Sequence, residues 1–278
     1  MCKLKPEITC IAPNAWCISE YKLVNAFLVA GNDRAVLIDT GCGIGDFSQV
    51  VKELTDKPLF VLLTHGHADH AGGLVRLPGT RVYVGPEDKD MDRIMPCDNH
   101  FRRLYIEYRV EYRFPGEGHK QALLDMLPPD PAAVEFKDFI PLTENQCFDL
   151  GGRVLYTVHT PGHTEGSYCF LDPAERILFS GDTVNNSIIL MRQPEQSMRL
   201  VEQYRTTLNK LWSMSDRYDR LAIGHDGITV DKQLVKDYLD LTTGLLDGSI
   251  TGKYEESGFR KGDVARLGLA ELWYQCDA

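Results

Sequence analysis

Short apolar runs separated by glycine, proline and asparagine turns occupy the first eighty or so residues of the chain. Runs of this length with turn residues between them are typical of β-strands, and a 3.6-residue apolar period indicates one short amphipathic helix. A continuous apolar run at 59–63 predicts a buried strand. The predicted strands are 8–12, 15–19, 24–30, 34–39, 59–63 and 81–84, and the predicted helix is 47–54.

Residues 86–130 interrupt this pattern, because charged and aromatic side chains replace the alternation. Their spacing predicts helices, with a break at Pro115-Gly116 and an end at Pro128-Pro129. The two halves of the chain share a coarse order of strands followed by a helix, without a repeat of fixed period. In the second half the predicted strands are 153–160, 167–171, 176–180 and 221–223, and the predicted helices are 197–214 and 231–247.

Composition narrows the class of protein. A chain of 278 residues is one or two domains long and can bury a large core without disulfides. Its 43% hydrophobic and 25% charged residues exclude long disorder, collagen-like repeats and a coiled coil as the main content. The formal net charge of −10 repels phosphate backbones, so we expect no nucleic-acid partner.

Eight cysteines are present, but no Cys-x-x-Cys pair gives a thiolate zinc site a local signature. The first residues do not follow the pattern of a secretory leader. No apolar run approaches the roughly 20 residues that span a bilayer. We therefore expect a reduced, cytoplasmic protein with mostly buried thiols and no membrane partner.

Three histidines and one carboxylate lie within six residues, directly after the apolar run at 59–63. They are His65, His67, Asp69 and His70. Neutral imidazoles and a carboxylate are the ligands that zinc and similar divalent ions take. His65 and His67 can project to one side, whereas Asp69 and His70 lie past the turn and can face a second ion. This density predicts a metal site rather than a polar turn.

Three further candidates each follow a predicted strand and stand beside a glycine: His163, Asp182 and His225. Glycine permits the turns that such sites require. Taken singly, each of the three is more typical of a turn residue than of a ligand. Taken with the cluster at 65–70, they favour a metal site built from distant segments.

Residues 65–70, followed by His163, Asp182 and His225, resemble the complete ligand set of the metallo-β-lactamase fold hydrolases. Segments 36–43 and 160–167 are also similar to motifs of that superfamily. The resemblance implies an α/β fold, a single-domain four-layer αββα sandwich over residues 1–278. It would have two mixed β-sheets, outer helices and a helical, lid-like insertion at about 86–130.

The resemblance also implies a role for each ligand. One divalent ion would be held by His65, His67 and His163, a second by Asp69, His70 and His225, with Asp182 bridging both. Asp39 resembles the buried aspartate that supports a ligand histidine, with a simple turn aspartate as the alternative. The ions are expected to be zinc, with manganese or iron as alternatives, and to share a hydroxide that attacks the substrate. Asp69 would also act in catalysis by relaying a proton.

The implied activity is metal-dependent hydrolysis of a small-molecule ester, thioester or lactone. Asp182 disfavours a true β-lactamase, because the β-lactamases that resemble this motif order generally lack the bridging aspartate. The acidic surface favours a carbonyl substrate over a phosphodiester, and phosphodiesterase stays an alternative on the same site. The alternative from another class is a non-hydrolytic, iron-binding redox or binding member of the fold.

Candidate substrate contacts are Tyr105 and Tyr108 in the aromatic insertion, together with Asn185 and Arg192. Asn185 stands where homoserine lactonases often carry a tyrosine, and Arg192 is a candidate for the cationic residues of glyoxalase II-like thioesterases or a solvated surface arginine. The insertion is either a lid over the metals or a packing surface, including that of a homodimer. Since metal-dependent hydrolysis requires no side-chain nucleophile, Ser167, Ser180 and Cys42 are expected to be structural.

Overall fold

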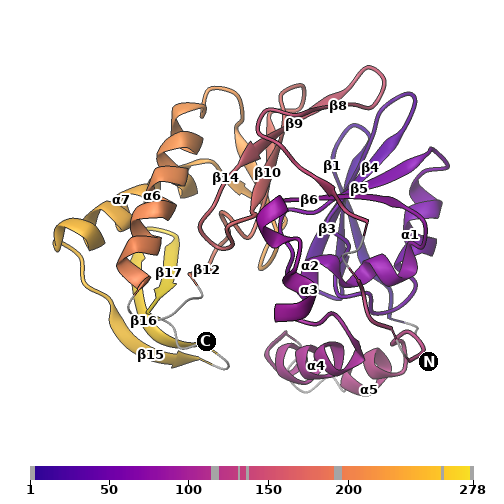
Figure 1. Ribbon diagram of the computed structural model, residues 1–278, viewed down its shortest axis with the longest axis horizontal. Coiled ribbons are helices and arrows are strands. Elements are labelled where there is room, and N and C mark those ends of the chain that lie inside the picture. Colours follow the sequence, from indigo (N-terminus) through magenta and orange to yellow (C-terminus); the bar gives the residue numbers. More distant parts are fainter. Residues whose placement is uncertain are drawn as a thin grey trace. The chain divides into compact units, whose positions relative to one another are not determined.

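The computed structural model describes residues 4–113, 119–130, 132–135, 138–190, 196–257 and 260–275 (Figure 1). The chain divides into two compact units, Met1–Leu155 and Tyr156–Ala278. The expectation of a single domain over the whole chain stays a prediction. Among the helices of the described ranges, none combines the length and the apolar composition needed to cross a membrane.

A seven-stranded mixed sheet forms the centre of the first unit. In spatial order its strands are β1 (Glu7–Ala12), β2 (Ala15–Glu20), β3 (Val24–Ala30), β4 (Ala35–Ile38), β5 (Leu59–Leu62), β6 (Arg81–Val84) and β7 (Ile140–Pro141). Strands β1 to β4 are antiparallel neighbours, and β5, β6 and β7 continue from β4 in parallel. Strands β3 and β4 are buried along their whole length, and their sequences are apolar at every position except Asn25.

Helix α1 (Phe47–Leu54) makes the crossover between the parallel strands β4 and β5. Asp46 caps it by accepting the backbone N–H of Gln49, and Phe47 and Val51 are buried in the core of the unit. Strand β8 (Cys147–Asp149) ends the unit, with the Phe148 ring stacked 5.5 Å from that of Phe60. The strands and the helix predicted before residue 85 are confirmed.

Short helices fill the predicted insertion: η2 (Pro86–Asp88), α3 (Met91–Ile94), α4 (Asn99–Arg113) and α5 (His119–Leu124). Ile106 and Val110 of α4 are buried with Leu123 of α5 in a cluster that also contains Leu23 and Val24. The insertion therefore has a hydrophobic anchor on the turn between β2 and β3. Its helical character is confirmed, while the expected break at Pro115-Gly116 lies outside the described residues.

The second unit has its own mixed sheet, in which five strands are neighbours in the order β14 (Thr229–Asp231), β13 (Arg220–Ile223), β11 (Ile177–Gly181), β10 (Tyr168–Asp172) and β9 (Val154–His159). Only β11 and β13 pair in parallel among these. Helices α6 (Ser197–Ser213) and α7 (Gln233–Asp247) share a hydrophobic core with the sheet, and their Tyr204 and Tyr238 rings meet edge to face at 5.9 Å.

A third, four-stranded sheet was not predicted from the sequence. Its order is β12 (Ile188–Ile189), β17 (Ala270–Tyr274), β16 (Arg260–Leu267) and β15 (Lys253–Ser257). Charged residues interrupt the apolar positions of β16, and β15 is exposed at most of its positions, so neither makes an apolar run. The α/β fold class, with several mixed sheets and helices, is confirmed.

Candidate functional site

The turn at 65–70 follows the carboxyl end of β5, which lies between the parallel neighbours β4 and β6. Ligands of α/β sheets commonly bind at this edge. His67 is the extended residue before α2 (Ala68–Ala71), so His65 and His67 precede the helix while Asp69 and His70 lie in its first turn. The backbone thus separates the four side chains into two pairs.

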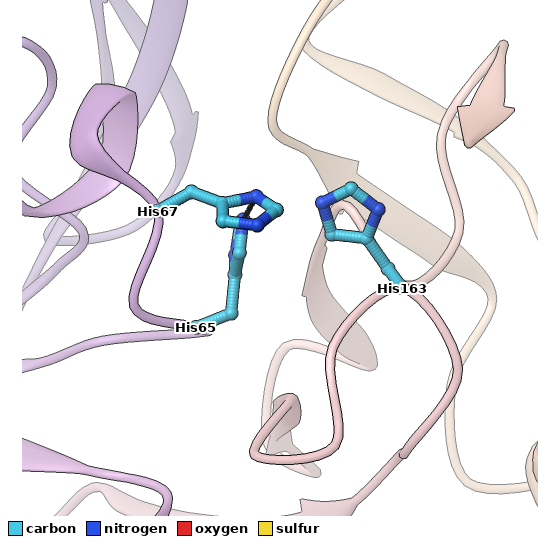
Figure 2. A group of neighbouring side chains, drawn as sticks. All are labelled: His65, His67 and His163. Atoms are coloured by element: carbon cyan, nitrogen blue, oxygen red, sulfur yellow. Dashed lines mark hydrogen bonds between the residues drawn. The ribbon is translucent and has the colours of Figure 1, made fainter. Parts of the chain in front are cut away.

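The first pair consists of His65 and His67, whose rings meet edge to face with centroids 4.6 Å apart (Figure 2). Nε2 of His65 lies 3.0 Å from Nδ1 of His67, while Nδ1 of His65 lies 3.1 Å from the Thr64 hydroxyl. Two imidazole nitrogens that converge in this way have the donor chemistry and the spacing of neighbouring metal ligands.

Asp39 supports the second pair. Its Oδ2 lies 2.9 Å from Nδ1 of His70, and it accepts both the backbone N–H and the hydroxyl of Thr64 at 2.7 Å. Asp39 is 1% exposed, so the contact is sheltered from water. A carboxylate on Nδ1 fixes the orientation of the imidazole and makes Nε2 the nitrogen that would bind a metal, as ligand histidines require. The contact expected between Asp39 and a candidate ligand histidine is therefore present.

The insertion contacts the same turn at several points. Asp88 accepts the N–H of Gly66 at 2.8 Å, and the Cys97 thiol donates to the carbonyl of Ala68 at 3.1 Å. Both contacts reach the backbone on either side of His67. The insertion therefore helps to set the shape of the ligand turn, a role distinct from that of a lid or a dimer surface.

The two tyrosines predicted to contact substrate lie differently on α4. The Tyr105 hydroxyl donates to Oδ2 of Asp69 at 2.9 Å. Burial, and to a lesser degree the Asp69 carboxylate, raise the pKa of Tyr105 well above its usual value, so it stays a donor. Tyr108 is 39% exposed on the same helix. Arg192 lies outside the described residues.

In the second unit the three candidate ligands follow three strands that run in the same direction. β10 is antiparallel to both β9 and β11, and β13 is parallel to β11, so the carboxyl ends of β9, β11 and β13 lie at one edge. His163, Asp182 and His225 come after these three ends. The sheet therefore brings together residues that are far apart in the sequence.

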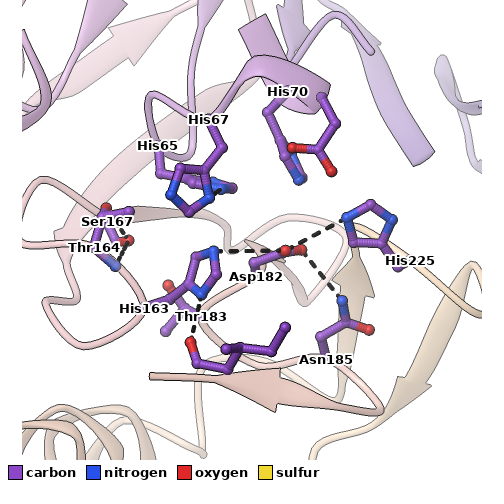
Figure 3. A network of polar contacts seen from close by, with 12 residues as sticks. His65, His67, His70, His163, Thr164, Ser167, Asp182, Thr183, Asn185 and His225 are labelled. Carbon is purple, nitrogen blue, oxygen red and sulfur yellow. Dashed lines mark hydrogen bonds and ion pairs between the residues drawn. The ribbon is translucent and has the colours of Figure 1, made fainter. Parts of the chain in front are cut away.

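Oδ2 of Asp182 lies 3.8 Å from Nε2 of His163 and 3.4 Å from Nε2 of His225 (Figure 3). Two ligand atoms that bind the same tetrahedral zinc ion at ~2.1 Å lie roughly 3.4 Å from each other. The separations are long for hydrogen bonds and suit ligands of metal ions. One carboxylate oxygen placed near two imidazoles is the arrangement expected of a bridging ligand.

The main chain and a side-chain amide orient this group. Nδ1 of His163 lies 2.8 Å from the carbonyl oxygen of Ile189 in β12, which leaves its Nε2 for a metal. Asn185 donates to Oδ1 of Asp182 at 3.2 Å and is 2% exposed. Asn185 thus contacts a candidate ligand; its predicted contact with substrate stays a prediction.

The three residues expected to be structural rather than nucleophilic are Ser167, Ser180 and Cys42, and all three are buried in the fold. The Ser180 hydroxyl donates to the carbonyl of Val184 at 2.8 Å, and the Ser167 hydroxyl pairs with that of Thr164 at 2.7 Å. Burial raises the pKa of the Cys42 thiol well above its usual value, which keeps the thiol protonated and a poor nucleophile. These contacts support the expectation that all three are structural.

Sequence reasoning missed the residues that brace the ligands: Thr64, Asp88, Cys97, Arg102 and Ile189. Asp88 and Thr64 stand close to strand ends, a position that could have marked them. Ile189 acts through its carbonyl group, which carries no sequence signal. All seven predicted ligands belong to groups of described side chains that could hold a metal ion.

A family model described as the metallo-beta-lactamase superfamily matches residues 21–225 of the chain. This range contains the seven candidate ligands and Asp39. The match confirms the resemblance seen in the sequence motifs.

Several curated relatives carry thioesterase names. The acyl-coenzyme A thioesterase MBLAC2 of Gallus gallus is 27% identical over 212 residues, 72% of this chain and 72% of that protein. The protein of the same name from Homo sapiens is 26% identical over 215 residues with the same coverage. An atrochrysone carboxyl ACP thioesterase of Aspergillus fumigatus is 25% identical over 189 residues, 65% of this chain and 35% of that protein.

Solved structures agree on the fold. A metallo-beta-lactamase superfamily protein from Sulfolobus tokodaii is 20% identical, covers 79% of this chain and 80% of its own, and gives a TM-score of 0.52. A metallo-beta-lactamase from Pontibacter korlensis is 19% identical, covers 86% and 99%, and gives a TM-score of 0.59. At these identities the likeness shows the fold and not the substrate.

Proposed function

Because the chain belongs to the metallo-β-lactamase superfamily and is a hydrolase, we propose that it cleaves a small-molecule acyl thioester with two divalent metal ions. The main support for metal binding is the position of one Asp182 carboxylate oxygen near the imidazoles of both His163 and His225. The thioester part is supported by the names of the relatives, which describe thioesterases acting on coenzyme A or carrier-protein thioesters.

The two ligand groups are proposed to form one centre because the family match includes all seven residues. His65, His67 and His163 would hold one ion, and Asp69, His70 and His225 the other, with Asp182 shared. The residues fit such ions chemically: Nδ1 of His70 and Nδ1 of His163 each face an oxygen, which leaves the opposite nitrogens for metal.

When bound, two such ions supply a water of lowered pKa as the nucleophile and stabilise charge on the oxygen of the carbonyl under attack. The protein's part is to hold the ligands in place. Asp39 and the Ile189 carbonyl set the ring tautomers, and Tyr105 contacts the Asp69 carboxylate. A thiol of pKa about 8.5 leaves more readily than an alcohol, so a thioester makes a weak demand on the proton relay proposed for Asp69.

We propose zinc as the metal, because histidine and aspartate are ordinary zinc ligands, with manganese or iron as the alternatives. A small molecule is the proposed partner, without nucleic acid or membrane, and a homodimer and a cytoplasmic location stay predictions. A phosphodiesterase and a non-hydrolytic iron protein are outcomes that the following experiment distinguishes.

The test is turnover by the metal-loaded protein on an acyl thioester, a lactone and an aryl phosphodiester, with metal content measured alongside. We expect the thioester to be preferred and turnover to disappear after treatment with a chelator and return with zinc. Preference for the phosphodiester would contradict the substrate class. Tightly bound iron without hydrolysis of any substrate would contradict hydrolysis itself.

A further inference from the structure

Helix α4 is fixed firmly against the turn that carries Asp69. Arg102 is fully buried, and its guanidinium donates to the carbonyls of Cys42 at 2.6 Å, Ala132 at 2.6 Å and Gly72 at 3.0 Å. Gly72 is the residue that directly follows α2, the helix containing Asp69. Because a buried cation needs all its acceptors, these bonds set the register of α4 against the ligand turn.

Tyr105 stands nearly one turn beyond Arg102 on the same helix, and its ring has a neighbour one turn away in each direction. The Phe101 ring centroid lies 5.4 Å from that of Tyr105, and the Arg109 guanidinium carbon lies 5.3 Å from the Tyr105 ring centroid. These contacts limit rotation of the tyrosine side chain. Its hydroxyl is thereby held 2.9 Å from Oδ2 of Asp69, whereas the Leu23 carbonyl is a longer contact at 3.5 Å.

We infer that Tyr105 is a positioning residue for Asp69. By donating to one carboxylate oxygen, it orients the side chain so that the other oxygen is presented as a single metal ligand. The insertion is then part of the framework of the second metal ion, through Arg102 and Tyr105, in addition to any contact with substrate. This inference rests on the proposed function insofar as Asp69 is a metal ligand.

The test is the removal of one oxygen atom in Tyr105→Phe, matched by Tyr21→Phe. Tyr21 belongs to the same hydrophobic cluster as Tyr105, but its hydroxyl donates to the sulfur of Met126. Zinc affinity of each equivalent is measured by competition with a chromophoric chelator, and kcat and KM with the preferred thioester. Phe101→Leu is a second variant, which keeps the tyrosine hydroxyl and loosens the ring.

For Tyr105→Phe we expect one of the two zinc equivalents to lose about 10- to 100-fold in affinity, the range typical of groups that orient a metal ligand. The other equivalent should be unchanged, and kcat should fall with little change in KM. Phe101→Leu should give a smaller loss of the same kind. Tyr21→Phe should keep both affinities, even where its melting temperature falls as far as that of Tyr105→Phe.

Equal zinc affinities in Tyr105→Phe and wild type would overturn the inference, as would equal losses in the two tyrosine variants, which indicate a merely structural role. A wild-type protein that binds two zinc ions but cleaves no thioester contradicts the proposed function alone, since the affinities still report on Tyr105. A wild-type protein that binds fewer than two ions overturns both. Should Tyr105→Phe not fold, unchanged zinc affinity in Phe101→Leu would overturn the inference.

Discussion

The two groups of candidate ligands are built in opposite ways. In the first unit, His65, His67, Asp69 and His70 come from one short turn, and side chains from other segments brace them. In the second unit, each ligand follows a different strand, and the direction of the strands brings them together.

This difference teaches where each group is sensitive to substitution. The turn of the first unit depends on side chains such as Asp39 and Arg102, so single substitutions there should disturb ligands indirectly. The second group depends mainly on backbone, including the Ile189 carbonyl that faces His163, with the Asn185 amide as a side-chain contact of Asp182. There we expect the ligands themselves to be the main sensitive positions.

The largest effect is expected at Asp182, the proposed shared ligand. Its loss in Asp182→Ala removes the carboxylate near both His163 and His225 and should lower turnover about 1,000-fold, a few kcal/mol of transition-state stabilisation. Bound metal per chain should fall as well. Asp216→Asn, an exposed carboxylate of the same unit, is the control. Unchanged metal content and turnover in Asp182→Ala would show that Asp182 is not a metal ligand.

Arg102→Met tests whether the buried guanidinium holds α4 in place in the first unit. Three carbonyl groups lose a charged, buried donor, so we expect the free energy of unfolding to fall by about 3 kcal/mol, measured by urea denaturation. Arg103→Met is the neighbouring control, because the Arg103 side chain is 52% exposed and its ion pair with Asp130 is 4.0 Å long. It should change stability by less than about 0.5 kcal/mol. Equal stabilities of the two variants would show that α4 is held by its apolar face alone.

Asp39→Asn changes the contact that orients the candidate ligand His70. An amide in place of the carboxylate cannot hold the His70 ring with the same charge, so metal affinity should fall about 10- to 100-fold. Asp33→Asn, an exposed carboxylate two residues before β4, serves as its control. Chelator competition measures both. A metal affinity in Asp39→Asn equal to that of the control would leave Asp39 as a turn aspartate.

A pH-dependent effect is expected at Glu20, whose two oxygens accept the N–H groups of Cys42 at 2.6 Å and Ile44 at 2.7 Å. Burial raises the pKa of Glu20 from 4.5 to about 7, although these donors lower it. Between pH 4.5 and pH 7 the native state therefore keeps a proton on Glu20 that the unfolded chain has released. The free energy of unfolding consequently falls as the pH rises from 4.5 through 7. Unfolding of the metal-free protein, compared with Glu20→Gln from pH 5 to pH 8, should show the wild type losing more. Parallel curves would contradict this assignment.

The sequence by itself determined most of the elements and the chemistry of the ligands. The apolar run at 59–63 and the density of histidine at 65–70 are local features, and local periodicity reports strands, helices and ligand types directly. Strand ends beside glycine likewise indicated His163, Asp182 and His225. The resemblance of these residues to one superfamily then predicted the fold class, which the family match confirms.

Only the tertiary structure decided what surrounds those ligands. Strand β15 is mostly exposed and gives no apolar signal, so the third sheet appears only when its backbone pairs. The Ile189 carbonyl acts on His163 whatever its side chain is, and Tyr105 reaches Asp69 across 36 residues of chain. Such contacts depend on how distant segments pack and on where backbone groups point, and neither can be predicted from the spacing of residue types.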